Sequence, residues 1–153
     1  MPSDANAPLV QHHTLEFPGG YTRSVGPVTG KFLTGLRDGV FLGNATAAGR
    51  VMCPPMEYDP ETGENAADTW SECGPGGTVT SFTWITEPKR KHPLQRPFAF
   101  ALVQLDGADT SILHALDAPQ DALSVGMRVT AQFKDERVGH ITDIAAFVPE
   151  VTS

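Results

Sequence analysis

The second half of the chain carries hydrophobic positions in runs that are typical of β-strands. Residues 78–86 are dominated by Thr, Val, Phe, Trp and Ile, which fit a pleated, half-buried surface. Residues 98–105 are apolar on both alternating faces, as expected of a strand that is covered on both sides. Residues 128–134 alternate cleanly, with an apolar residue at every second position. The pattern therefore predicts a strand in each of these segments.

Two further segments complete a set of five predicted strands. Residues 111–116 follow an Asp-Gly turn and pair naturally with the preceding run as a hairpin, and residues 141–148 form the last strand. Residues 119–123 predict a turn or a short helical bridge between the third strand and the fourth. Five strands with a bridge at this place suit a mainly β, OB-type barrel, which closes a small sheet and limits its exposed edges.

A short helix is predicted between Pro27 and Gly39. Its apolar residues fall near positions i, i+4, i+5 and i+8 and so share one face: Val28, Phe32, Leu33 and Leu36. Proline near the start and glycine near the end both favour these limits. Each glycine inside the helix weakens it by up to about 1 kcal/mol relative to alanine, so the helix relies on packing. Residues 40–42 then predict a short strand.

Residues 43–69 separate this helix from the β-rich half and are rich in Gly, Pro, Asn, Asp and Glu. Ordering a backbone costs about 1–2 kcal/mol per residue, and this segment has few apolar groups to offset that cost. We therefore expect the segment to be held by docking onto the barrel or onto a partner, or to be mobile. Glu57, Asp59 and Glu61 lack the regular spacing of a calcium loop, which indicates a solvated acidic loop.

The chain accordingly divides into four parts. Residues 1–27 form an N-terminal arm, because the first twenty or so carry Pro, Gly, Asn and His without a periodic apolar pattern. Residues 28–69 hold the helix and the Gly- and Pro-rich segment, residues 70–150 the barrel, and residues 151–153 a tail.

Composition limits the function classes. The 153 residues, 40% of them hydrophobic, suffice for the core of one domain with a small appendage. A net charge of −7 argues against a broad nucleic-acid surface, because phosphate binding depends on clustered Lys and Arg. No apolar run predicts a transmembrane helix, and the start of the chain lacks the pattern of a signal peptide, so we expect a cytoplasmic protein. Two cysteines are too few for a disulfide framework.

No catalytic residue is predicted. The serines lie in no G-x-S-x-G setting, and the histidines share no metal-binding spacing beyond the adjacent pair His12 and His13. His114 is interpreted as a hydrogen-bonded strand residue. Cys53 is predicted to be a small buried hydrophobic residue and Cys73 a loop thiol.

The order of the motifs resembles that of a known family. A short helix and a Gly-rich segment with Pro-Pro and Trp are followed by GGTVTSFTWI, RPFAFALVQLDG, LSVGMRV and AAFVPE. This order is similar to the acyl-CoA-associated OB-fold family, also called domain of unknown function thirty-five. The resemblance runs from about Val28 to Glu150. In that family a rubredoxin-like zinc ribbon precedes a small β-barrel.

The resemblance implies a ribbon that has lost its metal ligands. A four-cysteine zinc site needs two close pairs of thiolates. In the register of the family these pairs fall on Ala45 with Ala48 and on Asp59 with Thr62. None of the four is a cysteine, so we expect no zinc. The expected anchors of the ribbon segment are then Pro54, Pro55, Tyr58 and Trp70.

The family resemblance also implies a function. Many members are accessory subunits of thiolase-like or related acyl-CoA enzymes, so we expect a noncatalytic accessory subunit of a thiolase-like enzyme, an aldolase or a hydratase. The barrel and residues 73–77 are expected to complete a wall of the acyl-CoA channel, with acyl-CoA at the shared interface and no cofactor of the chain's own. Breakdown of steroid side chains or other bulky acyl-CoA esters is compatible with the resemblance. The alternatives are a stand-alone binding module for acyl-CoA or a nucleotide and, less favoured, a binder of single-stranded nucleic acid.

One loop is rich in basic residues, although the chain as a whole is acidic. Lys89, Arg90, Lys91 and Arg96 are four of the eleven Lys and Arg residues and lie within eight positions, between the first two barrel strands. Three interpretations stay open: contact with the phosphates of coenzyme A, contact with an acidic patch of a partner, and a solvated hairpin tip. Flanking prolines stiffen the connection, which favours a presented recognition surface.

Overall fold

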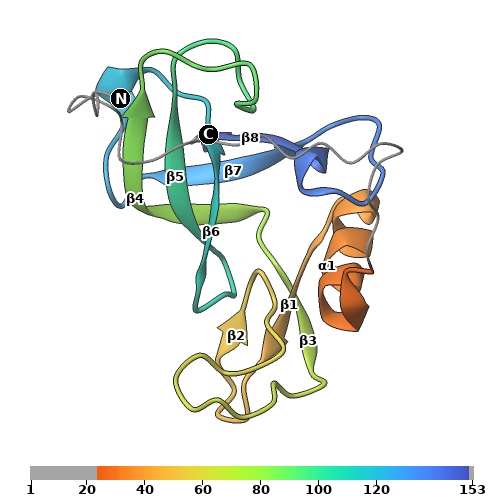
Figure 1. Cartoon of the computed structure of the whole chain (residues 1–153). Helices are drawn as coiled ribbons and strands as arrows, with labels where there is room; N and C mark the ends of the chain where they lie inside the picture. The colour runs from red at the N-terminus through yellow and green to blue at the C-terminus, as the bar shows by residue number, and fades with distance from the viewer. Residues whose placement is uncertain (1–23, 152–153) are drawn as a thin grey trace, which may run out of the picture.

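The computed structural model describes residues 24–151, which form a small three-stranded sheet, a helix and a barrel (Figure 1). The first part contains α1 (Gly26–Asp38), β1 (Phe41–Ala45), β2 (Val51–Met52) and β3 (Trp70–Cys73). The barrel contains β4 (Gly76–Ile85), β5 (Phe98–Leu105), β6 (Ser111–Leu116), η1 (Gln120–Ala122), β7 (Arg128–Phe133), η2 (Ile141–Asp143) and β8 (Ile144–Pro149). Most of the predicted arm, part of the tail, and His12 and His13 lie outside the described residues.

The predicted OB-type barrel is confirmed, with five strands closed in the order β4-β5-β6-β8-β7. The pairs are antiparallel except for β6 with β8, which run parallel and meet at Leu116 and Phe147. A bulge between Val79 and Ser81 lets β4 bend, so that it pairs with β7 before the bulge and with β5 on both sides of it. Apolar side chains fill the interior: Val79, Ala99, Ala101, Val103, Ile112, Leu116, Val129, Ile144 and Phe147.

The start of the last predicted strand differs from the structure. Residues 141–143, predicted to begin the last strand, form the 3-10 turn η2 instead. The reason is a capping box, in which His140 and Asp143 exchange side-chain and backbone hydrogen bonds and so hold the backbone in a turn. The bridge predicted over 119–123 is confirmed as η1.

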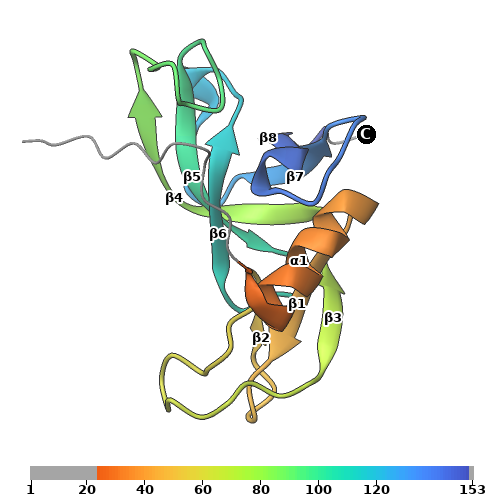
Figure 2. The ribbon, with the colours of Figure 1, turned by 45° about the vertical axis from the view of Figure 1, so that its right-hand side comes forward.

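The helix α1 begins and ends as predicted. Pro27 stands in its first turn, and Gly39 closes it in the left-handed conformation with a φ of 81°. Phe32 and Leu36 are buried, and α1 runs alongside β1 (Figure 2). Gly35 has a packing role, because a Cβ at this position would lie only 3.0 Å from the Leu42 side chain. Within residues 24–151, α1 and the two 3-10 turns are too short or too polar to cross a membrane.

The Gly- and Pro-rich segment and its flanking residues form an ordered sheet, which we call the ribbon sheet, in the order β2-β1-β3. Residues 70–73, which the sequence placed at the start of the barrel, pair with β1 here. The segment does contribute apolar groups, since Met52 and Cys53 are fully buried. Tyr58 is 55% exposed, so the prediction that it anchors the segment is wrong.

One core runs through both parts of the molecule. Phe32 and Leu36 of α1, Phe41 of β1 and both cysteines belong to the same buried cluster as the barrel interior. The ring of Phe41 lies 5.2 Å from that of Phe133 and 6.3 Å from that of Phe147, measured between centroids. Of the alternatives left open by the sequence, docking onto the barrel is therefore the one that the structure supports.

Candidate functional site

The basic loop, residues 86–97 between β4 and β5, is folded back on the barrel. His92 holds it, because its ring packs edge-on against Phe98 and Phe100, with centroids 5.8 Å away in each case. The His92 N–H donates to the carbonyl of Lys89 over 2.8 Å, and the Lys89 N–H donates to His92 Nδ1 over 3.2 Å. The predicted stiffness of this loop therefore has a second source beside its prolines.

The four predicted site residues of the basic loop fall into two groups. Lys89, Arg90 and Lys91 are consecutive and exposed. Arg96 instead forms an ion pair with Asp117, just after β6, which ties the end of the loop to the barrel. Three cations are thus presented to solvent, and the fourth has a partner of its own.

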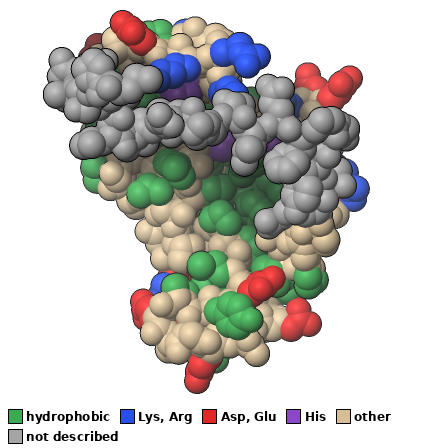
Figure 3. All heavy atoms as spheres, in the orientation of Figure 1, with side chains coloured by type: hydrophobic (Ala, Val, Ile, Leu, Met, Phe, Trp, Pro, Cys, Tyr) green, Lys and Arg blue, Asp and Glu red, His purple; other side chains and the backbone are tan. Residues whose placement is uncertain are grey.

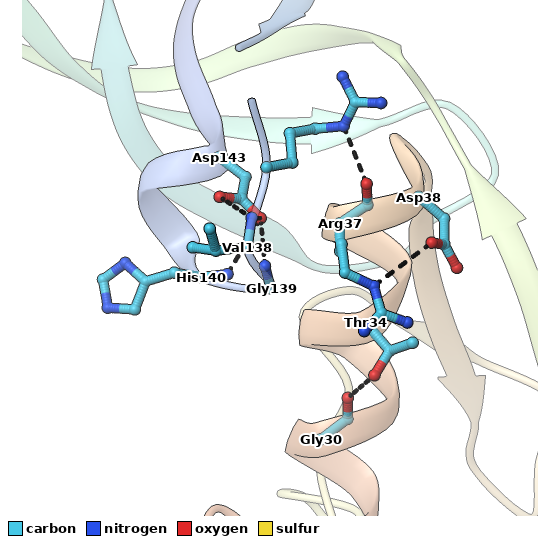
Figure 4. A network of polar contacts seen from close by, with 9 residues as sticks. Gly30, Thr34, Arg37, Asp38, Val138, Gly139, His140 and Asp143 are labelled. Atoms are coloured by element: carbon cyan, nitrogen blue, oxygen red, sulfur yellow. Dashed lines mark hydrogen bonds and ion pairs between the residues drawn. The ribbon is translucent and has the colours of Figure 1, made fainter. Parts of the chain in front are cut away.

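The cap loop, residues 134–143 between β7 and β8, is fixed by Asp143 (Figure 4). The buried Asp143 carboxylate accepts hydrogen bonds from the backbone N–H groups of Val138, Gly139 and His140, at 2.7–3.2 Å. Burial alone would raise the pKa of Asp143, but these donors outweigh it and hold the pKa below its ordinary range. The loop therefore has a fixed shape.

A second contact of the cap loop reaches α1. Arg137 Nε donates to the carbonyl of Arg37 over 2.9 Å, and Arg137 Nη1 donates to the carbonyl of Lys134 over 2.7 Å. The cation thus lies at the C-terminal end of the helix, where its charge complements the helix dipole. This contact orients the cap loop relative to the first part of the chain.

The basic loop and the cap loop border one hollow, which we call the barrel hollow. Its volume is about 270 Å³, and strands β5 and β6 form its floor. It is lined by Lys91, Pro93, Phe100, Leu113, His114, Ala115, Ile141 and Thr142. Strands two and three of an OB barrel, together with the loops that join strands one to two and four to five, form the usual ligand face of this fold.

His114 is the polar group in the floor of the barrel hollow. It is 8% exposed, and within residues 24–151 its Nδ1 is a buried side-chain atom with no hydrogen-bond partner. The prediction of a hydrogen-bonded strand residue is therefore wrong for this nitrogen. Burial lowers the pKa of His114, although backbone groups of Ile141 and Ala115 oppose the shift, so the ring is neutral near pH 7.

The barrel hollow continues into an exposed apolar surface. Leu102 of β5 and Leu113 of β6 are direct cross-strand partners and are 39% and 60% exposed. Figure 3 shows hydrophobic side chains gathered over the barrel on this face, with Lys and Arg side chains toward the end where the basic loop lies. Apolar side chains that cluster on a surface in this way mark binding sites more often than scattered ones do.

Residues 73–77, which are expected to complete a wall of the acyl-CoA channel together with the barrel, lie away from the basic loop. They lead into the start of β4, whereas the basic loop follows the end of β4, so the two are separated by the length of the strand (Figure 1). A Cβ on Gly76 would lie 2.8 Å from Asp106 Oδ2, and one on Gly77 would lie 2.7 Å from the carbonyl of Gln104. These glycines allow the backbone of β4 to pack closely against neighbouring groups.

The two turns that would carry the zinc ligands keep a regular shape. In the first, the Thr46 N–H donates to the Arg50 carbonyl over 2.7 Å, and the Arg50 N–H donates to Thr46 Oγ1 over 3.1 Å. In the second, the Asp59 N–H donates to the Glu64 carbonyl over 2.8 Å, and Asp59 Oδ1 accepts the Glu61 N–H over 2.9 Å. Asp59 is buried, so the prediction of a solvated loop is wrong at this residue.

Polar contacts join these turns. Arg50 and Glu61 form an ion pair between the first turn and the second. The buried Asn44 side chain donates to the Met56 carbonyl over 2.8 Å and accepts the Met56 N–H over 3.1 Å. These contacts hold the segment at two places.

The residues at the four ligand positions do not fit zinc. Ala45 and Ala48 offer no side-chain donor atom, and the Asp59 carboxylate is already hydrogen-bonded within its own turn. Over the described part of the chain, no group of three His, Cys, Asp or Glu side chains is placed to hold an ion. That the protein carries no zinc stays a prediction.

The two cysteines lie close together in the ribbon sheet. Cys53 is buried as predicted, whereas Cys73 ends β3 and is 5% exposed, so its placement in a loop is wrong. Burial raises the pKa of both thiols, and for Cys53 the neighbouring Cys73 raises it further. Both residues act as small buried side chains.

Reasoning from the sequence missed two of the residues that shape this site. His114 was seen only as a strand residue, and Asp143 was not singled out at all. The Gly-His-Ile-Thr-Asp sequence at 139–143 contained only part of a capping signal: Asp143 stands three residues after the N-cap, as the acidic residue of a capping box does, but the N-cap is His140 and not the usual Ser or Thr. The position of His114 beside a hollow had no such signal, because the hollow is bordered by two loops that are distant from each other in the sequence.

Comparison with known proteins agrees with this fold. Residues 70–134 match the family model described as ChsH2, C-terminal OB-fold domain. A solved structure of the Ltp2-ChsH2(DUF35) aldolase superposes with a TM-score of 0.63 at 19% identity, covering 85% of this chain and 100% of that one. A protein of unknown function from the DUF35 family of Sulfolobus solfataricus superposes with a TM-score of 0.62 at 18% identity, covering 82% of this chain and 85% of that one. No curated protein matches the chain.

At these identities the structural neighbours establish the fold, and the family model adds the type of OB-fold domain. Residues 70–134 therefore resemble the C-terminal OB-fold domain of ChsH2, and the predicted resemblance of the chain to the acyl-CoA-associated OB-fold family, domain of unknown function thirty-five, is confirmed as a resemblance.

Proposed function

We propose that this chain is a noncatalytic accessory subunit of an aldolase-type enzyme that acts on acyl-CoA substrates. The observation that carries the proposal is the exposed apolar face of β5 and β6 beside the basic loop, on a chain with the fold found in the Ltp2-ChsH2(DUF35) aldolase. An apolar face with a cationic border suits a protein partner that also handles an anionic substrate.

The partner face is centred on Leu102 and Leu113. A solvent-exposed leucine pair on adjacent strands exposes apolar area that burial against a second protein would remove from water. Each square ångström so buried stabilises a complex by about 25 cal/mol before the costs of association are subtracted. The partner supplies the nucleophile and the base, and this chain supplies surface.

The basic loop is proposed to contact the phosphates of coenzyme A at the edge of the shared interface. Lys89, Arg90 and Lys91 supply three exposed cations on a loop that His92 holds against the barrel. Coenzyme A carries a diphosphate and a 3′-phosphate, which accept charge-assisted hydrogen bonds from such side chains. Arg96 has a different role, since it pairs with Asp117.

The test is copurification of the chain with each acyl-CoA enzyme encoded near it, followed by activity assays with and without the chain. Leu113→Asp should abolish copurification, because it places a charge in the apolar face. Val125→Asp is the matched control, since Val125 is 65% exposed but lines none of the hollows on this face. Failure of the wild-type chain to bind any of these enzymes would reject the proposal.

A double charge reversal tests the role of the basic loop. Lys89→Glu with Arg90→Glu should weaken the complex or raise the apparent KM for the acyl-CoA substrate, because it turns two attractive contacts into repulsive ones. If both quantities are unchanged, the loop has no part in the function.

The second candidate function is a stand-alone binding module for acyl-CoA or a nucleotide, favoured by the position of the barrel hollow on the usual ligand face of an OB barrel. Calorimetry of the isolated chain with coenzyme A esters separates the two. An accessory subunit that completes a shared site should bind these esters weakly alone, whereas a binding module should saturate.

A further inference from the structure

Another hollow, which we call the ribbon hollow, lies where the start of α1 meets the ribbon sheet. Its volume is about 270 Å³. Most of its lining is apolar and comes from the first turn of α1, the residues before β3 and β3 itself: Pro27, Val28, Ala66, Ala67 and Trp70. None of these residues belongs to the partner face or to the basic loop, so the ribbon hollow is a separate surface.

The polar groups of the ribbon hollow that are free to meet a ligand are carboxylates. Its remaining lining residues are Asn44, Glu57 and Asp68. The side chain of Asn44 is already bonded to the backbone of Met56 through both its nitrogen and its oxygen. Glu57 and Asp68 are exposed, and neither takes part in an ion pair between described residues. Among the described residues, no Lys, Arg or His lines the hollow.

The indole of Trp70 adds a surface on which a cation can stack. Its Nε1–H donates to Asp68 Oδ1 over 3.0 Å, which places one of the two carboxylates beside the ring. The ring already attracts a cation of the chain itself, since Lys31 Nζ lies 4.3 Å from its centroid. Lys31 forms no ion pair within residues 24–151, so its charge leaves both carboxylates available. An aromatic face beside carboxylates favours an organic cation.

The surroundings of the ribbon hollow favour a protein segment over a small free cation. Residues 43–73 contain six acidic residues and one basic residue, a balance that attracts a basic partner. Met56 and Tyr58, on either side of Glu57 in the sequence, are 45% and 55% exposed. Figure 3 shows hydrophobic side chains next to Asp and Glu side chains at the end of the molecule formed by the ribbon sheet. A free cation would leave this apolar surface in water, whereas a peptide would cover it.

We propose that the ribbon hollow receives an arginine side chain from an extended segment of a protein partner, with apolar neighbours of that arginine against Met56 and Tyr58. Arginine suits the hollow better than lysine, because its planar guanidinium stacks on the indole and its five N–H donors serve both carboxylates. The apolar stem of the arginine packs against Val28 and Ala67. This docking surface does not depend on the proposed accessory role.

The probe is the peptide acetyl-Leu-Arg-Leu-amide, titrated into the chain and followed by NMR through the indole N–H signals of the two tryptophans. The signal of Trp70 should shift saturably, whereas Trp84 in β4 does not line the hollow and is the internal reference. The same peptide with citrulline in place of arginine keeps the shape without the charge, and agmatine keeps the guanidinium without the apolar neighbours. Each should bind at least about threefold more weakly.

Three variants and one control test the named residues, all of which are exposed and so tolerate the change. Glu57→Gln and Asp68→Asn should each weaken peptide binding about two- to fivefold, although Asp68→Asn keeps an oxygen that accepts the Trp70 N–H. Lys31→Gln should strengthen binding about twofold, because it removes the cation that competes for the ring. Glu64→Gln is the matched control, since it removes the same charge from the same segment at a residue that does not line the hollow.

Absence of a saturable shift at Trp70 would overturn the proposal. Equal binding of the arginine and citrulline peptides would also overturn it, as would a loss of binding in Glu64→Gln as large as in Asp68→Asn, because the attraction would then be apolar only or spread over the whole acidic segment. Agmatine binding as tight as that of the peptide would reject a protein segment as the occupant. Failure of the chain to copurify with an aldolase would reject the accessory role but leave this result untouched.

Discussion

The ribbon sheet and the barrel of this chain are held together in different ways. The barrel closes on itself through five paired strands around an apolar interior. The ribbon sheet has three short strands, and its turns are joined by the Arg50–Glu61 pair and by the side chain of Asn44. The barrel therefore depends on burial, which acts at every core position, whereas the ribbon turns depend on a few polar contacts.

The ribbon sheet is also held by its contacts with the barrel. Phe41 carries the ribbon sheet into the barrel core, and β2 is bonded to the turn between β5 and β6. There the Val51 N–H donates to Asp109 Oδ2 over 2.8 Å, and the Cys53 N–H donates to Thr110 Oγ1 over 2.8 Å. The segment that resembles a zinc ribbon is thus fastened to its neighbour by both apolar and polar contacts.

The largest expected effect comes from the core that the two regions share. Phe147→Ala removes a fully buried ring that packs against Phe41, and should cost about 3–5 kcal/mol in the free energy of unfolding. The chain has one tryptophan in each region, Trp70 in β3 and Trp84 in β4. Denaturant unfolding of Trp70→Phe and Trp84→Phe backgrounds therefore reports each region separately.

Both tryptophan probes should show one coincident transition, moved equally by Phe147→Ala. Two separate transitions, with only the Trp84 signal displaced, would mean that the ribbon sheet and the barrel unfold independently.

The next largest effect concerns the contact between the regions. Thr110→Val keeps the shape of the side chain but leaves the Cys53 N–H and carbonyl without their partner, which should cost about 1–3 kcal/mol. Hydrogen exchange should accelerate at Cys53 and its neighbours more than in β5. Thr80→Val is the control, because it removes an exposed hydroxyl contact to the Leu102 carbonyl. Equal acceleration in both variants would deny this contact a special role.

A pH series tests how much the Asp143 carboxylate in the cap loop contributes to the stability of the barrel. The pKa of Asp143 lies below its ordinary value, so its contribution to stability is complete above the unfolded-state pKa, about 3.9, and is lost as the pH falls through the folded-state pKa. Asp143→Asn should therefore be less stable than wild type at pH 7, and the difference should close below about pH 4.

Asp135→Asn, an exposed neighbour in the same loop, is the control for this series and should stay close to wild type at every pH. A constant difference between Asp143→Asn and wild type from pH 7 to pH 3 would contradict a role for the ionised carboxylate.

A smaller effect is expected for the ion pair of the ribbon turns. Arg50 and Glu61 are 34% and 70% exposed in their side chains, so solvent screens the pair, and a double-mutant cycle should give no more than about 1 kcal/mol. The cycle for Arg37 and Asp38, 3.6 Å apart and also exposed, provides the reference. A coupling energy well above 1 kcal/mol would place the ribbon turns among the main determinants of stability.

The smallest expected effect is that of a chelator. Because the ligand positions do not fit zinc, EDTA should leave the melting temperature unchanged, and elemental analysis should find no stoichiometric zinc. One zinc per chain, or a large loss of stability in EDTA, would show that the register of the ligand positions is wrong.

Much of the fold followed from local pattern. The five barrel strands, the bridge η1 and the limits of α1 were predicted because strand and helix periods and turn residues act over a few neighbouring positions. The start of β8 was misplaced because the 3-10 turn at 141–143 is held by the hydrogen bonds of Asp143, which the apolar pattern does not register. Of the site, the sequence located the basic loop but not the cap loop opposite it.

The sequence by itself determined the barrel type, the family resemblance, the loss of cysteines at the ligand positions and the cluster of Lys89, Arg90 and Lys91. Only the tertiary structure decided that Arg96 is paired, that Tyr58 is exposed and that His114 lies in the floor of a hollow. The physical reason is the separation along the chain over which each property is determined. Local sequence sets backbone preferences and charge, whereas burial, ion pairing and hollows depend on segments that are distant in the chain and meet only after folding.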